Sequence, residues 1–199
     1  MKKFAGLLAL MLLSLTFVGC DKKESQEQTE SPVVLFQGAV ELSDKKFGLY
    51  YGDKYGNEVG VYYVVLSDAM CFNNGYADPY MDSEGDMVVL RFKTDILALD
   101  AAVELPAGEY AVSNEAVQNV VYAPGSYVTR MTGSTQVNWA VKSGAVTVAK
   151  DEKGVYSVVA TGLAIEKDGV ADTLDYFCKS SLVMSDYMEV APTLVSDRD

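Results

Sequence analysis

Residues 136–183 of this chain read QVNWAVKSGAVTVAKDEKGVYSVVATGLAIEKDGVADTLDYFCKSSLV. Three runs rich in Val, Tyr and Thr, at 136–149, 154–166 and 170–183, are separated by segments that contain Asp and Gly. β-Branched and aromatic residues favour strands, whereas Asp and Gly adopt the positive φ angles that tight hairpin turns require. The stretch therefore predicts three consecutive antiparallel strands, a β-meander.

Alternation of side chains assigns faces to these strands, because successive residues of a strand point to opposite sides of the sheet. In the last run, Leu174, Tyr176 and Cys178 share one face, which we predict to face the core. The parity of the apolar residues switches near 143–144, and a β-bulge would explain this switch. We expect Trp139, the only tryptophan, to be a core residue.

Seven further runs of the same kind lie upstream, and no stretch after Pro32 keeps a helical period over several turns. Residues 96–103, rich in Ala and Leu, would form at most one helical turn. We therefore predict an all-β domain, an antiparallel β-barrel or β-sandwich of about 8–10 short strands. The seven runs are 33–42, 47–52, 59–70, 86–94, 107–112, 119–123 and 126–131.

The run 86–94 is predicted to have two unlike faces. One face is uniformly apolar and the other carries two cations, so the first should face the core and the second should face water. The predicted inner residues are Val88, Leu90 and Phe92, and the predicted outer residues are Met87, Val89, Arg91 and Lys93.

The start of the chain has the pattern of a bacterial export signal. Two lysines precede an almost unbroken apolar run at 4–18, and Gly19 and Cys20 close it. A charged start, an apolar centre and a small residue before cleavage define a signal peptide, and this apolar run is too short to span a bilayer comfortably. We predict a signal peptide at 1–19.

Residues 15–20, LTFVGC, resemble a bacterial lipobox, although Phe17 stands where Leu is usual. The resemblance implies that Cys20 is diacylated through its thiol and acylated on its amine, so membrane lipid is an expected partner. Several acyl chains together anchor a protein stably where one would not. Residues 20–32 contain no large apolar side chain after the cysteine, and we expect them to form a flexible tether.

The expected organisation is thus a signal peptide, the lipidated cysteine with its tether, an all-β domain at 33–190 and a C-terminal tail at 191–199. The expected location is the bacterial cell envelope, lipid-anchored to a membrane. The outer membrane is favoured, on its periplasmic or its surface face. Asp21 resembles an inner-membrane retention signal of some bacteria, so the choice of membrane stays open.

Charge and composition exclude several classes of function. The chain has a formal net charge of −12, and the predicted leader contains two of its 16 basic residues and none of its 28 acidic ones. A phosphate backbone would be repelled by such a surface, so we expect no nucleic-acid partner. The chain has no histidine, which excludes Ser-His-Asp and Cys-His catalysis and His-ligated zinc or haem. We predict no catalytic residues, no metal and no cofactor.

Three segments resemble a group of bacterial lipoproteins with lipocalin-like, or calycin-like, β folds. These segments are LPAGEYAV at 105–112, SGAVTV at 143–148 and GVYSV at 154–158, and the resemblance spans about residues 47–183. It implies a surface or periplasmic β module. It assigns no functional residues.

Cys71 and Cys178 are the two cysteines that remain after lipidation. An exported protein meets an oxidising environment, which favours a disulfide between them. That bond would close a loop of about a hundred residues and contribute up to about 4–5 kcal/mol in the chain-entropy model. Two buried thiols that act as small apolar side chains are the alternative.

The longest polar interruption of the predicted domain lies at 72–86, and loops of this length are often functional. Its aromatic residues among Asn, Asp and Gly suit contact with a sugar or a protein, and the alternative is a solvated loop whose aromatics cap the core. Its acids do not form an EF-hand, because Met87 and Lys93 stand where Gly and Glu are required, but a looser calcium site is conceivable. The candidate ligand-loop residues are Phe72, Tyr76, Tyr80, Asp78, Asp82, Glu84 and Asp86.

These observations predict a membrane-anchored lipoprotein whose β domain is a non-enzymatic binding or adhesion module for a glycan, lipid or protein ligand. A structural or assembly subunit of an envelope complex is the main alternative. A small hydrolase that uses two carboxylates is a third, and it would require two acids converging in a cleft.

Overall fold

A computed structural model describes residues 39–41, 45–53, 56–69, 71–73, 79–98 and 100–186. The predicted signal peptide, Cys20, the tether and the C-terminal tail lie outside these residues. In the described part of the chain, no helix has the length and apolar character needed to cross a membrane.

The described residues are all-β, as the sequence predicts, and they contain fourteen strands and no helix. The strands are β1 (Ala39–Glu41), β2 (Lys45–Tyr50), β3 (Gly60–Ser67), β4 (Cys71–Asn73), β5 (Pro79–Met81), β6 (Gly85–Thr94), β7 (Gly108–Ser113), β8 (Val120–Tyr122), β9 (Tyr127–Thr132), β10 (Thr135–Ser143), β11 (Ala145–Lys150), β12 (Tyr156–Lys167), β13 (Val170–Ser180) and β14 (Met184–Asp186).

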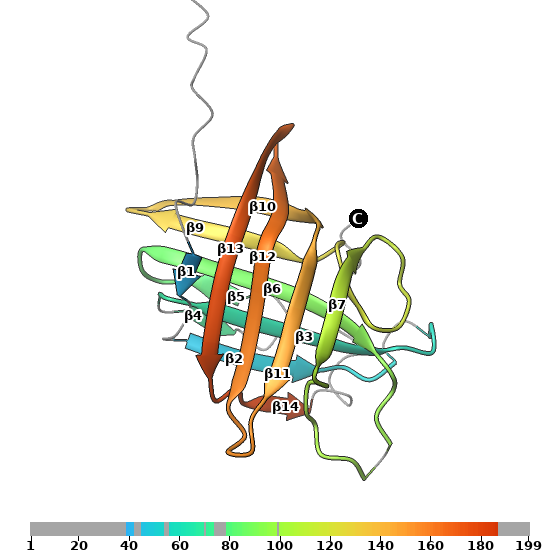
Figure 1. Cartoon of the computed structure of the whole chain (residues 1–199). Coiled ribbons are helices and arrows are strands. Elements are labelled where there is room, and N and C mark those ends of the chain that lie inside the picture. Colours follow the sequence, from blue (N-terminus) through green and yellow to red (C-terminus); the bar gives the residue numbers. More distant parts are fainter. Residues whose placement is uncertain are drawn as a thin grey trace, which may run out of the picture. The chain divides into compact units, whose positions relative to one another are not determined.

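Twelve of these strands form one sheet that folds into two crossing layers. In Figure 1, β13, β12, β11 and β7 run up the front, and β9, β6, β3 and β2 run across behind them. The hydrogen-bonded path β12-β11-β7-β8-β6-β9-β10 returns to β12, so the two layers are joined along two sides as in a barrel. β4 and β5 form a separate two-stranded hairpin.

The space between the layers is filled by one hydrophobic cluster to which both layers contribute. Large buried side chains occupy much of it, including Tyr50, Tyr62 and Tyr110. The faces predicted to point inward are confirmed, because the following residues are all buried members of this cluster: Val88, Leu90, Phe92, Trp139, Leu174, Tyr176 and Cys178.

The predicted meander is confirmed, with β11, β12 and β13 paired antiparallel. In the turn between β11 and β12, Asp151 Oδ1 accepts hydrogen bonds from the backbone N–H of Lys153 and of Val155, each at 2.9 Å. In the turn between β12 and β13, Asp168 and Gly169 have φ angles of 52° and 81°, the conformation for which the Asp-Gly pair is suited.

The predicted bulge is also confirmed. The pairing of β10 with β12 shifts register between Val141 and Ser143, and Gly144 follows with a φ angle of 120°. A second bulge, in β12, was not predicted: its pairing with β13 shifts between Ala160 and Leu163. The run that the sequence predicts as one strand at 136–149 is therefore divided at the bulge into two strands, β10 and β11.

The prediction that Met87, Val89 and Lys93 face water is wrong, and Arg91, which was predicted to lie with them, is half-buried. Met87 and Val89 are fully buried, and Lys93 is 1% exposed. A second hydrophobic cluster covers the outer face of β2, β3 and β6, so these strands are buried on both sides. The cations are accommodated beside aromatic rings: Lys93 Nζ lies 5.1 Å from the ring centre of Tyr122, and Arg91 Cζ lies 4.8 Å from that of Tyr63.

Three short strands were missed by the sequence reasoning: β4 and β5, which lie in or beside the region predicted as a polar loop, and β14, which pairs with β2 in parallel. In the segment predicted to form at most one helical turn, Ala101 N donates to Ala98 O at 2.9 Å, and the described residues among 96–103 form no helix.

Candidate functional site

The predicted ligand loop folds back on itself as the β4–β5 hairpin, in which Phe72 is paired with Tyr80. Tyr80 is 47% exposed, as a ligand-contacting aromatic would be. Tyr76, Asp78 and the side chain of Phe72 lie outside the described residues. Of the three aromatics proposed for this loop, the structure therefore describes only the side chain of Tyr80.

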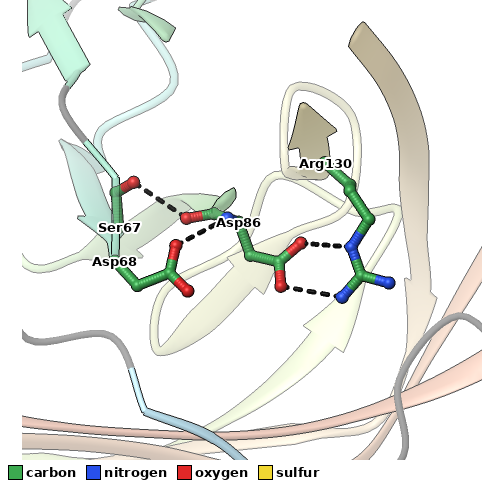
Figure 2. Close-up of polar contacts among 4 residues, drawn as sticks. All are labelled: Ser67, Asp68, Asp86 and Arg130. Atoms are coloured by element: carbon green, nitrogen blue, oxygen red, sulfur yellow. Dashed lines mark hydrogen bonds and ion pairs between the residues drawn. The ribbon is translucent and has the colours of Figure 1, made fainter. Parts of the chain in front are cut away.

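Asp86, at the end of the predicted loop, forms an ion pair within the protein (Figure 2). Arg130 of β9 donates from Nε to Asp86 Oδ1 at 2.7 Å and from Nη2 to Asp86 Oδ2 at 2.8 Å. Both carboxylate oxygens are thus engaged. A planar guanidinium that binds a carboxylate at two points fixes orientation as well as distance, so this pair fastens β6 to β9.

The backbone of Asp86 is held from the other side by the end of β3, as Figure 2 shows. Asp68 Oδ1 accepts a hydrogen bond from Asp86 N at 2.6 Å, and the Ser67 hydroxyl donates to Asp86 O at 2.8 Å. The hydrogen bond to Asp86 raises the pKa of Arg130, whereas partial burial, with the nearby Asp86 charge, raises the pKa of Asp68. These four residues form a structural clasp in which every oxygen of Asp86 already accepts a hydrogen bond from the protein.

The remaining acids of the loop do not converge on this clasp. Glu84 Oε1 accepts a hydrogen bond from Gly133 N at 2.7 Å and so closes the turn between β9 and β10, and Asp82 is exposed. Among the described residues, no three Asp, Glu, Cys or His side chains are grouped so that they could hold a metal ion. The structure therefore does not assemble Asp82, Glu84 and Asp86 into one site.

Cys178 is buried in β13 opposite Val158 of β12. Cys71 belongs to β4, but its side chain lies outside the described residues. The disulfide between the two cysteines stays a prediction.

The segment 95–107, which connects β6 to β7, packs against the interior cluster through Leu97, Val103 and Leu105. Three tyrosine hydroxyls bind its backbone: Tyr62 donates to Glu104 O at 2.9 Å, Tyr110 donates to Pro106 O at 2.7 Å, and Tyr50 accepts from Leu97 N at 2.8 Å. Burial raises the pKa of Tyr110 to about 12 and raises that of Tyr62 further. Buried tyrosine hydroxyls need hydrogen-bond partners. These three find theirs in the backbone of the segment and thus hold it in place.

A shallow hollow of 310 Å³ lies on the outer face of β11, β12 and β13. Its aromatic member is Phe177, which is 38% exposed and faces away from the core. Alternation along β13 placed Phe177 and Lys179 outward, but the sequence could not show which residues of neighbouring strands lie beside them. Its lining includes Ala149, Asp151, Val155, Ser157, Phe177 and Lys179.

Comparisons of the chain with protein-family models, with curated proteins and with solved structures found no match. The site is therefore interpreted from its own geometry.

Proposed function

We propose that this protein is a lipid-anchored component of the bacterial cell envelope, and that its β domain is a non-enzymatic binding module. The lipobox-like segment that ends at Cys20 supports the anchor. The domain would bind its ligand on the outer face of β11–β13, in the hollow around Phe177.

The observation that carries the binding role is the contrast between the inside and the outside of the domain. Between the layers, buried side chains from both layers pack into one cluster, and tyrosine hydroxyls fasten the segment 95–107 to it. Outside, Phe177 keeps more than a third of its surface exposed on a face that is otherwise held rigid by strand pairing. Exposed aromatic side chains on a rigid scaffold are typical of binding surfaces.

The chemistry of the described residues favours binding over catalysis. The chain has no histidine, and the acids Asp68 and Asp86, which lie close together, belong to the clasp, where Asp86 is ion-paired with Arg130. A hydrolase of the two-carboxylate type needs one acid free to donate a proton and one free to attack or to activate water. Asp86 is committed to its ion pair and is unsuited to either role.

A second candidate function, a structural or assembly subunit of an envelope complex, is favoured by an exposed apolar side chain on β13. Val170, at the start of this strand, is 53% exposed. Exposed apolar side chains can contribute to contacts with another protein.

The anchor is tested by metabolic labelling with a clickable fatty acid in cells that express the wild type or Cys20→Ser. We expect label on the wild type and none on the variant. Equal labelling of both proteins, or of neither, would overturn the anchor.

The binding surface is tested in intact cells with a photo-crosslinking residue at Thr147, which is exposed and belongs to the outer face of β11. A matched position is Val117, which is 47% exposed and lies outside the strands. We expect a defined envelope component to be captured from position 147 and not from 117. Capture of the same material from both positions, or from neither, would contradict a binding role for this face, and capture from position 170 alone would favour the assembly subunit.

A further inference from the structure

The short strand β14 covers part of the edge of β2 in the rear layer (Figure 1). Among the described strands, β2 pairs with β3 on one side and with β14 on the other. The parallel pairing with β14 spans residues 48–50, and the backbone N–H of Gly48 donates to Val183 O at 2.9 Å. This part of β2 therefore already has a strand partner within the molecule.

The presence of glycine at position 48 is explained by a side chain of β14. Gly48 lies within a strand and its φ angle is outside the left-handed region, so its backbone conformation does not require glycine. A Cβ at this position would lie 2.6 Å from Met184 Cε and closer still to Met184 Sδ. Glycine inside a strand often marks a close approach by another part of the structure. Here Met184 fills the notch that the missing side chain of residue 48 leaves.

Met184 is one of two side chains through which this segment reaches the interior cluster. Leu182 is a buried member of that cluster and Met184 packs against it, whereas Val183 between them is 67% exposed. Gly48 is paired with Val64 of β3, which is also a buried member of the cluster, so the notch opens toward the interior. Met184 thus holds β14 against β2 from the inside.

The stretch of β2 that β14 covers is the one most suited to pair with another chain. β2 reads KKFGLY: it begins with two lysines, and its uncharged end is the stretch paired with β14. Charged residues, lysine above all, discourage pairing at a sheet edge, whereas a bare uncharged edge is a template for another strand. The edge of β2 is thus protected by charge over its first residues and by β14 over its last.

A second copy of the chain offers a complementary edge. Two copies of β2 related by a two-fold axis would pair antiparallel, and a pair centred on Leu49 would place Lys45 of each copy opposite Asp53 of the other. Hydrogen bonding to β3 continues past the end of β2, from Val61 N to Gly52 O at 3.0 Å, so the paired backbone extends nearly to Asp53. Opposite charges on facing residues stabilise a strand pair.

We propose that β14 is a guard strand: with Met184 seated in the notch at Gly48, it keeps the edge of β2 from pairing with β2 of a second copy. Release of β14 exchanges a strand pair within the molecule for one between molecules. The balance between monomer and dimer is therefore set by how firmly Met184 is held. This inference is independent of the hollow around Phe177, and it adds a contact that controls self-association.

The test is sedimentation equilibrium of the full-length protein in a density-matched detergent, at about 10 to about 100 μM protein. Met184→Asp places a charge in the notch, and Gly48→Val fills it. We expect a monomeric wild type, and a dimer dissociation constant at least about tenfold lower in both variants. Hydrogen exchange at residues 184–186 should be at least about tenfold faster in both, because β14 is released.

Two matched controls carry the same new side chains outside the notch. Val183→Asp adds a carboxylate at the exposed neighbour of Met184. Gly108→Val adds a side chain at an exposed glycine of β7, where a Cβ would lie 3.7 Å from Tyr110 Cε2, an ordinary contact distance. Both controls should remain monomeric, with exchange at 184–186 like that of the wild type.

A charge change at the edge itself identifies the surface that pairs. In the Met184→Asp background, Lys45→Glu places like charges opposite each other and should raise the dimer dissociation constant at least about threefold. Lys153→Glu, at an exposed lysine of the β11–β12 turn, makes the same charge change elsewhere and should alter it by less than about twofold.

Monomeric Met184→Asp and Gly48→Val proteins would overturn this inference, whether or not residues 184–186 exchange faster. A dimeric wild type, dimers in the two controls, or a dimer that Lys45→Glu leaves unchanged would overturn it as well. Where a larger side chain at position 48 prevents folding, Met184→Gly, which only empties the notch, replaces Gly48→Val with the same expected result. Crosslinking from position 147 tests the proposed function separately.

Discussion

Asp86 of β6 and Arg130 of β9 are joined by two parallel hydrogen bonds, of 2.7 and 2.8 Å, between a guanidinium and a carboxylate. Asp86 is 7% exposed, so the pair is shielded from water on the carboxylate side. The two strands are also paired through their backbones from Gly85 to Val89. The ion pair therefore fixes the position of β9 against β6 in the rear layer. From β9 the strand pairing continues through β10 to β12, which belongs to the front layer.

Arg130→Met is expected to lower the free energy of unfolding by about 2–3 kcal/mol, because it leaves the buried Asp86 carboxylate without its charge-assisted hydrogen bonds. Denaturant titration at neutral pH measures the change. The matched control is Lys142→Met, which breaks a pair with Glu166 at 3.5 Å whose two side chains are both more than a third exposed. That loss should be below about 1 kcal/mol. Equal losses for the two variants would show that the clasp has no special structural role.

Because the tyrosines that hold the segment 95–107 are buried, we predict that the free energy of unfolding decreases at alkaline pH. Burial raises the pKa of Tyr110 to about 12 in the folded protein, above the ordinary value of 10.0, so folding favours the neutral phenol. This stabilisation is fully present below pH 10 and is lost as the pH rises toward 12. We expect the free energy of unfolding to be flat from pH 7 to about 9.5 and to fall above pH 10.

Tyr110→Phe tests the source of this limit. The variant loses the hydrogen bond to Pro106 O, which should cost about 1 kcal/mol at neutral pH, and its stability should fall less steeply between pH 10 and 12. Denaturant titration at each pH, with absorbance of tyrosinate as a second readout, follows both effects. Tyr80→Phe, at an exposed position, should follow the wild-type curve. A wild-type slope in Tyr110→Phe would assign the alkaline loss to other groups.

The second hydrophobic cluster predicts that the outer face of β6 is sensitive to truncation. Met87→Ala removes a fully buried side chain and should cost about 2–4 kcal/mol, as large-to-small changes in cores do. Val170→Ala, at a position that is 53% exposed, should change stability by less than about 0.5 kcal/mol. A loss for Met87→Ala as small as that for Val170→Ala would mean that this face is solvated in solution.

The strands that alternate cleanly could be predicted from the sequence, and those buried on both faces could not. Alternation identified the inward residues of β13, because its other face carries Thr173, Asp175 and Lys179 and is exposed or half-buried. In β6 the same rule failed, because the cations Arg91 and Lys93 suggested water. Lys93 is in fact buried beside Tyr122. A single strand does not show whether another layer covers its outer face.

The candidate site was predicted only in part for a related reason. Outward placement of Phe177 follows from period-two alternation along β13, but its neighbours Ser157 and Val159 come from β12 through a register set by the bulge at Ala160–Leu163. That shift is not visible as a break in the apolar pattern of β12. Conversely, the loop acids formed a pattern in the sequence, yet Glu84 and Asp86 found partners from β9 and its turn. Partners that are distant in the chain decide which polar groups remain available.

The bulge between β10 and β11 offers a test of backbone conformation. Gly144 has a φ angle of 120°, outside the left-handed helical region that Asn tolerates, and a Cβ there would lie 3.2 Å from Leu163 Cα. Gly162 has a φ angle of 65°, and a Cβ there would meet nothing within 4 Å. Gly144→Asn should therefore lower the free energy of unfolding by about 2–3 kcal/mol, and Gly162→Asn by about 1 kcal/mol or less. Denaturant titration of the two variants compares the same side chain in two backbone conformations. Equal losses would mean that a side chain at position 144 costs no more than one at position 162. The bulge would then not constrain the register that places Val146 and Val148 in the core.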